Sequence, residues 1–193
     1  MKKKIGLLFG SFNPIHNGHL VIAQAVVNAH LTNEVWMTVS PQNPFKDPKN
    51  LLNQYDRLHL VQLAVADNIQ IKACDIEFKL PKPSYTIDTL TYLQERYPNY
   101  EFVVIMGEDN LEHFAKWKNH EKILKYYTLV VYPRMGYTAP DEYKNNPRIT
   151  FLEVPRLEIS ATYIRQTIKA GGSVRYLVPD KVFDYIAATK LWS

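Results

Sequence analysis

The sequence predicts an α/β fold in which a doubly wound parallel sheet carries helices on both faces. Short apolar runs, typical of buried strands, alternate with segments of helical spacing along the whole 193-residue chain. The candidate binding loops follow the strands, and parallel sheets bind their ligands at that end. No linker, repeat or low-complexity tract interrupts the alternation, so residues 1–193 are expected to form one Rossmann-like domain with a helical C-terminal end.

The first strand and the first helix enclose a polar turn. Residues 4–9 (KIGLLF) form an apolar run typical of a buried strand, and residues 20–27 (LVIAQAVV) form one typical of a buried helix. Between them lie residues 10–19, with the sequence GSFNPIHNGH. The free backbone N–H groups and the partial positive charge at a helix start suit phosphate oxygens. A phosphate-binding loop is therefore predicted here.

The middle of the chain continues the alternation. Residues 34–39 are predicted as a strand, and a loop rich in Pro, Asn and Lys follows over residues 40–53. Asn53 is expected to cap a helix whose inward residues are Leu58, Val61, Leu63 and Ala64. Residues 69–73 alternate like a strand.

The break at residues 81–83 separates this strand from the next helix. Ser84 or Thr86 is expected to cap that helix, and Pro98 to stop it. Residues 101–106 then form an apolar strand.

The remaining elements repeat the pattern to the end of the chain. They are, in order, a helix at 121–127, a strand at 128–132, a long loop at 133–147, a strand at 149–152 and two helices. Ser160 caps the first of these helices, residues 161–169, and two glycines end it. Pro179 suits the first turn of the last helix, because its φ angle is already helical.

The composition is that of an ordinary globular protein, with 46% hydrophobic and 22% charged residues. The net charge of +4 fits anionic substrates, but the basic residues are spread along the chain, so no nucleic-acid partner is expected. No apolar run approaches the ~18 residues of a membrane span, and no signal peptide is recognised. The single cysteine, Cys74, excludes an internal disulfide and favours a reducing compartment, so a cytoplasmic location is expected.

Two histidines in the first loop are candidates for contacts to phosphate. His16 and His19 are three residues apart and therefore share one face of the first helical turn, where imidazoles could donate hydrogen bonds to a phosphate as charge builds on it. A half zinc site is the alternative, but zinc needs three or four ligands and no thiolate is near, so no metal site is assigned. The loop matches neither the Walker pattern nor G-x-G-x-x-G.

A second candidate segment lies near the C-terminus, at residues 159–165 (ISATYIR). Ser160 and Thr162 place hydroxyl and N–H groups at a helix start, and the guanidinium of Arg165 can reach back to a phosphate. The plainer alternative is an ordinary capped helix with a surface arginine.

Both segments resemble signatures of the nucleotidyltransferase superfamily, G-x-F-x-P-x-H-x-G-H and I-S-S-T-x-x-R. Ala161 replaces the second serine, which puts one hydroxyl contact in doubt. Three further stretches, at residues 83–90, 106–111 with Trp117 beyond it, and 176–179, make the chain similar to the bacterial nicotinate mononucleotide adenylyltransferases over nearly its whole length.

This resemblance implies an enzyme that joins ATP and nicotinate mononucleotide into deamido-NAD and pyrophosphate, with Mg²⁺ accompanying ATP. It implies catalytic roles for His16, His19 and Arg165. The implied ATP-binding residues are Gly10, Ser11, Phe12, His16, Gly18, His19, Ser160, Thr162 and Arg165. The implied residues for nicotinate mononucleotide are Lys46, Tyr85, Thr86, Gly107, Asp109 and Trp117.

Some alternatives stay open at this point. The family usually has Pro-His-Lys after the second strand, and here Phe45 replaces the histidine and cannot form its hydrogen bond. Trp117 could be a surface-covering aromatic and Asp109 a turn residue. The acceptor could be nicotinamide mononucleotide or phosphopantetheine, or the chain could be a nucleotide-binding regulator without catalysis. Formation of a homo-oligomer is also left open.

Overall fold

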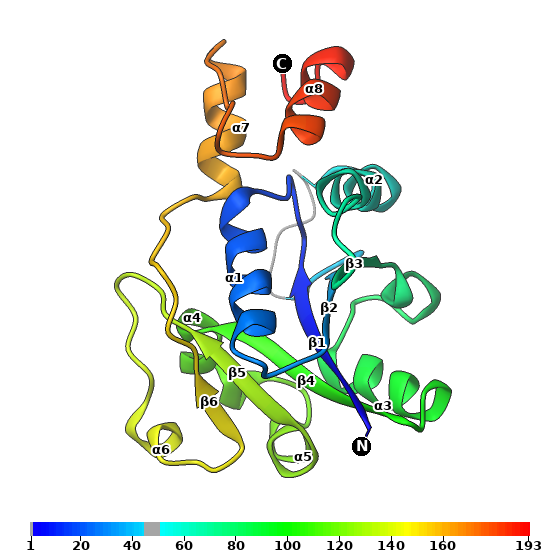
Figure 1. The fold of residues 1–193 in the computed structure, drawn as a ribbon, viewed down its shortest axis with the longest axis vertical. Helices are drawn as coiled ribbons and strands as arrows, with labels where there is room; N and C mark the ends of the chain where they lie inside the picture. Colours follow the sequence, from blue (N-terminus) through cyan, green and yellow to red (C-terminus); the bar gives the residue numbers. More distant parts are fainter. Residues whose placement is uncertain (1, 45–50) are drawn as a thin grey trace.

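The computed structural model describes residues 2–44 and 51–193, which form an α/β fold around one sheet (Figure 1). The sheet has six strands in the order β3-β2-β1-β4-β5-β6, and every neighbouring pair is parallel. The strands are β1 (Lys3–Gly10), β2 (Glu34–Val39), β3 (Ile71–Cys74), β4 (Tyr100–Gly107), β5 (Thr128–Tyr132) and β6 (Ile149–Phe151). The predicted doubly wound parallel sheet is confirmed.

The strand order reverses direction at the centre of the sheet. From β1 the chain winds outward through β2 and β3, and then returns to place β4 on the other side of β1. Such a reversal leaves a crevice at the carboxyl ends of the two central strands, because the connections leave on opposite sides. A ligand site is therefore expected where β1 and β4 end.

Helices cover both faces of the sheet (Figure 1). One apolar cluster joins the sheet to α1 (Asn17–Asn28), α2 (Gln54–Ala64), α7 (Ala161–Lys169) and α8 (Asp180–Thr189). The other joins it to α3 (Thr86–Arg96), α4 (Glu108–Glu112), α5 (His120–Tyr126) and α6 (Asp141–Lys144). Strand residues alternate between the two clusters, as the two-residue period of a strand requires. Across the described residues, no helix has the length and apolar character needed to cross a membrane.

Several local predictions are confirmed by hydrogen bonds. The side chain of Asn53 accepts from the N–H of Tyr55 at 2.9 Å, and the hydroxyl of Ser160 accepts from the N–H of Tyr163 at 3.2 Å. Pro179 immediately precedes α8, and Gly171, with φ of 77°, follows α7. These features could be predicted from the sequence because a capping residue lies within a few residues of the helix terminus that it caps.

Other local predictions were wrong. The strand predicted at residues 69–73 begins two residues later, at Ile71. The side chain of Asn68 accepts from the N–H groups of Gln70 and Ile71 and forms a turn before β3, which leaves Ile69 85% exposed. Tyr85 occupies the N-cap position of α3 without a side-chain hydrogen bond, so neither Ser84 nor Thr86 caps it. Four short helical segments, α4, α6, η2 (Ile76–Lys79) and η3 (Phe114–Lys116), occupy stretches where no helix was predicted.

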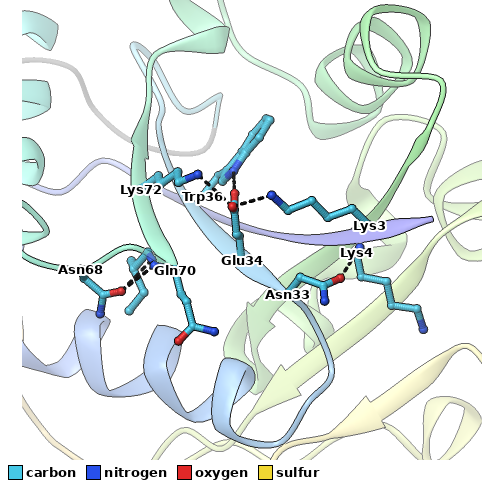
Figure 2. Close-up of polar contacts among 9 residues, drawn as sticks. Lys3, Lys4, Asn33, Glu34, Trp36, Asn68, Gln70 and Lys72 are labelled. Carbon is cyan, nitrogen blue, oxygen red and sulfur yellow. Dashed lines mark hydrogen bonds and ion pairs between the residues drawn. The ribbon is translucent and has the colours of Figure 1, made fainter. Parts of the chain in front are cut away.

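A buried carboxylate ties three strands together at their amino ends, opposite the crevice (Figure 2). Glu34, at the start of β2, accepts from Lys3 of β1 at 2.6 Å and from Lys72 of β3 at 2.8 Å. It also accepts from the indole N–H of Trp36 at 3.2 Å. Burial raises the pKa of Glu34, but these three hydrogen bonds outweigh burial and leave the pKa below its ordinary value.

Candidate active site

A cavity of about 430 Å³ opens at the carboxyl ends of β1, β4 and β5. Its lining contains every residue predicted to bind ATP, from both the loop after β1 and the start of α7. Gly10 is needed there because a Cβ atom at this position would lie 2.8 Å from the ring of Phe12, which folds back over it with φ of 45°. The structure thus brings together two segments that lie far apart in the sequence.

The two histidines of the first loop lie against each other. Their rings are stacked with centroids 3.6 Å apart, and the backbone N–H of His16 donates to Nδ1 of His19 at 3.3 Å. An accepting nitrogen carries no proton, so the neutral ring of His19 carries its proton on Nε2. Nε2 of His19 is therefore a hydrogen-bond donor.

His16 is the more buried member of the pair, with 5% of its surface exposed. Burial, and secondarily the positive charge of Arg134, lower its pKa from the ordinary 6.5 to about 4. The ring is consequently neutral at physiological pH. Its Nδ1 atom is buried beside the first turn of α1, where His16 and His19 form a capping-box arrangement.

Arg165 is a bridge between the two segments rather than a surface residue. Its Nη1 donates to the carbonyl oxygen of Asn13 at 2.7 Å, and its Nη2 donates to the hydroxyl of Thr162 at 3.2 Å. A guanidinium has five N–H donors in one plane, so this arrangement leaves donors for an anion in the cavity.

A second cavity, of about 80 Å³, adjoins the first. The two share five lining residues, which are Leu8, Phe9, Asn43, Asn110 and Tyr132. Tyr85 and Thr86, at the start of α3, line the second cavity together with Trp117. Trp117 is half-buried and packs edge-on against Phe114 with centroids 5.5 Å apart.

The other residues predicted to bind nicotinate mononucleotide do not share one location. Asp109 lines the first cavity, whereas Gly107 lines neither cavity and is the N-cap residue of α4. A Cβ atom at Gly107 would collide with the carboxylate of Asp109, so this glycine makes room for that side chain. Lys46 and Phe45 lie outside the described residues.

Three charged residues near the site were missed by the sequence reasoning. Arg134 lines the first cavity and pairs with Asp109 at 3.6 Å. Its position two residues after a predicted strand is the signal that could have found it, because such positions lie at the ligand edge of a parallel sheet. Arg57 and Glu77 are 0% and 1% exposed, and no local sequence pattern marks a buried charge.

Glu77 places a carboxyl group in the wall of the second cavity. Its Oε1 accepts from the hydroxyl of Thr89 at 2.8 Å, whereas Oε2 is buried without a partner in the described residues. Burial raises the pKa of Glu77, and the hydroxyl groups of Thr89, Ser40 and Ser84 offset only part of that rise. The group is therefore more easily protonated than an exposed glutamate.

Comparisons with known proteins identify the family of this chain. Residues 7–167 match the cytidylyltransferase-like family model. The chain is 51% identical over 190 residues to a Cytophaga hutchinsonii protein named "Probable nicotinate-nucleotide adenylyltransferase", with 98% of each chain covered. A Bacteroides fragilis protein of the same name is 40% identical over 185 residues, covering 96% of this chain and 92% of the relative.

Among solved structures, the fold is similar to the nicotinic acid mononucleotide adenylyltransferase of Plasmodium falciparum, determined in complex with NaAD. The TM-score is 0.83 at 21% sequence identity, covering 98% of this chain and 97% of that one. At this identity the similarity concerns the fold.

Proposed function

Because the chain belongs to the cytidylyltransferase-like family, and within it to the nicotinate-nucleotide adenylyltransferases, we propose that it transfers the adenylyl group of ATP to nicotinate mononucleotide. The products are deamido-NAD and pyrophosphate, which places the enzyme in NAD biosynthesis. The observation that carries the proposal is the convergence of the loop after β1 and the start of α7 on one cavity, beside a second cavity at the start of α3.

The proposed chemistry needs no protein nucleophile. A phosphate oxygen of the mononucleotide attacks the α-phosphorus of ATP and forms the new P–O bond. The bond between the α-phosphorus and the bridging oxygen breaks, and its electron pair leaves with pyrophosphate. Because the attacking oxygen is already ionised, catalysis depends on alignment and on stabilising spread negative charge.

The residues of the first cavity supply these two effects in the proposal. His19 donates from Nε2 toward the α-phosphate, where charge builds in the transition state. His16, whose ring is neutral at physiological pH, contacts the phosphates and takes up no proton there. The N–H groups at the start of α7, with Ser160, Thr162 and Arg165, hold the β- and γ-phosphates.

The second cavity holds the pyridine ring in the proposal. The backbone N–H groups of Tyr85 and Thr86, in the first turn of α3, have no intrahelical acceptors and face the carboxylate. Trp117 stacks on the ring, Asp109, for which Gly107 makes room, meets ribose hydroxyls from the first cavity, and Lys46 meets a phosphate.

Magnesium enters the proposal with ATP. Within the part of the chain that the structure describes, no three His, Cys, Asp or Glu side chains are grouped to hold a metal. Mg²⁺ commonly keeps several waters and binds through substrate phosphates, so ATP itself fits as its main ligand. When bound there, it neutralises phosphate charge.

One observation favours a second candidate acceptor, nicotinamide mononucleotide. Oε2 of Glu77 has no hydrogen-bond partner among residues 2–44 and 51–193, its carboxyl group lies in the wall of the second cavity, and it could accept from a carboxamide NH₂ group.

The test is pyrophosphate release with ATP and each of three acceptors, nicotinate mononucleotide, nicotinamide mononucleotide and phosphopantetheine, with a control that contains no acceptor. We expect turnover with the acid. Faster turnover with the amide would support the second candidate, and nucleotide binding without turnover would support a regulator.

A further inference from the structure

Arg57 of α2 is a fully buried cation whose recorded partners are all backbone carbonyl oxygens. Its Nη1 donates to Ser11 at 2.6 Å and to Ser40 at 2.8 Å, its Nη2 donates to Pro41 at 3.2 Å, and its Nε donates to Leu52 at 3.0 Å. It forms no ion pair with any described residue. Burial lowers its pKa to about 10, which still leaves it charged at neutral pH.

Three of the four carbonyl groups belong to the loops at the ends of two neighbouring strands, and the fourth, that of Leu52, lies just before α2. Ser11 follows β1, and Ser40 and Pro41 follow β2. The N–H of Ser40 also donates to the carbonyl oxygen of Gly10 at 2.9 Å, so the two strand ends are already adjacent. The planar guanidinium connects the two loops beyond the point where the strand pairing stops.

The loop after β1 lines the first cavity and the loop after β2 lines both. Ser11 lines the cavity proposed for ATP, Ser40 lines the cavity proposed for the acceptor ring, and Asn43 lines the two together. The second loop continues to Gln42, whose carbonyl oxygen accepts from the N–H of Ser84 at 3.0 Å, next to the start of α3. A chain of hydrogen bonds thus runs from the loop after β1, through Arg57, to the segment that carries Tyr85.

We infer that Arg57 is a positioning residue that sets the distance between the two substrates. The inference rests on the proposed function, because it assigns one substrate to each cavity. In a transfer between two bound substrates, a displacement of about 1 Å can cost roughly 10²-fold in rate. Each cavity can still bind its own substrate when the spacing between the two loops changes.

A purely structural role for Arg57 predicts a different experimental result. A buried charge is weak evidence for stability, because its desolvation opposes folding. If Arg57 only held the fold together, its loss would lower the melting temperature, and the surviving folded enzyme would work normally. If it positions the substrates, the folded enzyme itself would be slow.

The test compares Arg57→Lys with Glu34→Gln. Lysine keeps the charge but lacks the planar fork, so it cannot reproduce all four hydrogen bonds. Glu34→Gln weakens the fold at the opposite end of the sheet and serves as the control for lost stability. Kd is measured for each substrate alone, kcat is measured with both, and activity is expressed per folded molecule well below both melting temperatures.

We expect Arg57→Lys to lower kcat by roughly 10²-fold, with each Kd within about threefold of wild type. The control should keep its kcat, and Arg57→Gln should repeat the result if the lysine variant folds poorly. A kcat within threefold of wild type, an equal loss in the control, or a loss seen only as weaker binding of one substrate would overturn the inference. Absence of turnover in the wild type would instead refute the proposed function.

Discussion

Nη1 of Arg165 lies 2.7 Å from the carbonyl oxygen of Asn13, a residue 152 positions earlier in the chain. The bond joins α7 to the loop after β1, so the two segments form a single site. It also means that one guanidinium is shared between the loop backbone and any phosphate in the cavity. A change at Arg165 therefore affects both the charge in the site and the position of the loop.

We expect Arg165→Lys to raise KM for ATP and also to lower kcat. The positive charge attracts phosphates in the ground and transition states alike, and a single ammonium cannot reach Asn13 and a phosphate with the same geometry. Steady-state kinetics at varied ATP measures both parameters, with the exposed Arg148→Lys as the matched control. Unchanged KM and kcat would leave Arg165 a purely structural bridge.

His19→Ala should lower kcat by on the order of 10²–10³, as expected for loss of a donor to a transition-state oxygen. ATP binding should weaken much less, because the contact strengthens only as charge develops. Single-turnover rates and a separate ATP binding measurement distinguish the two effects. The exposed His113→Ala is the control, and a loss confined to ATP affinity would argue against the role.

The low pKa of His16 predicts a pH-dependent stability. The folded pKa of about 4 lies below the ordinary 6.5, so the unfolded chain takes up the proton first. The stabilisation is complete above pH 6.5 and is lost as the pH falls toward 4. From pH 7 to pH 5 the loss is about 2 kcal/mol.

Urea unfolding of the wild type and His16→Asn at both pH values measures this loss. The variant should lack it, since asparagine does not titrate. Equal pH dependence in the two proteins would show that His16 has an ordinary pKa in the folded state.

Glu34→Gln should destabilise the fold by about 1–2 kcal/mol, because two charged hydrogen bonds at the strand starts are weakened. Since the pKa of Glu34 is lowered, its contribution is present above the unfolded pKa and is lost as the pH falls through the folded pKa. Chemical denaturation at pH 7 measures the difference. Glu101→Gln, whose pair with Lys4 is half-exposed at 3.7 Å, should cost less than about 0.5 kcal/mol.

The enzyme should prefer nicotinate mononucleotide over its amide by roughly 10²–10⁴ in kcat/KM. A carboxylate accepts from two backbone N–H groups, whereas a carboxamide leaves one donor unsatisfied at ~1–3 kcal/mol and forfeits a charged hydrogen bond of ~1.5–3 kcal/mol. Because backbone groups make the distinction, Tyr85→Phe should keep most of the preference. Measuring kcat/KM for both mononucleotides at saturating ATP decides the matter, and a ratio near one would favour the amide-accepting alternative.

The sequence by itself determined the elements whose signals are local. The strands at 34–39 and 128–132 have the bounds that their apolar runs predicted, and Ser160 caps α7 as expected. The residues of the two motifs could also be named in advance from their resemblance to the superfamily signatures, and the position of their loops after strands agrees with the ligand edge of a parallel sheet.

The tertiary structure alone decided what depends on contacts between distant segments. The burial of Arg57 follows from carbonyl groups that three separate segments bring around it, and nothing in the helical pattern of α2 distinguishes it from an exposed arginine. The lowered pKa of His16 depends on packing and on Arg134, more than 100 residues away. Periodicity and capping act over a few residues, whereas desolvation and electrostatic interactions are set by neighbours that only the folded chain brings together.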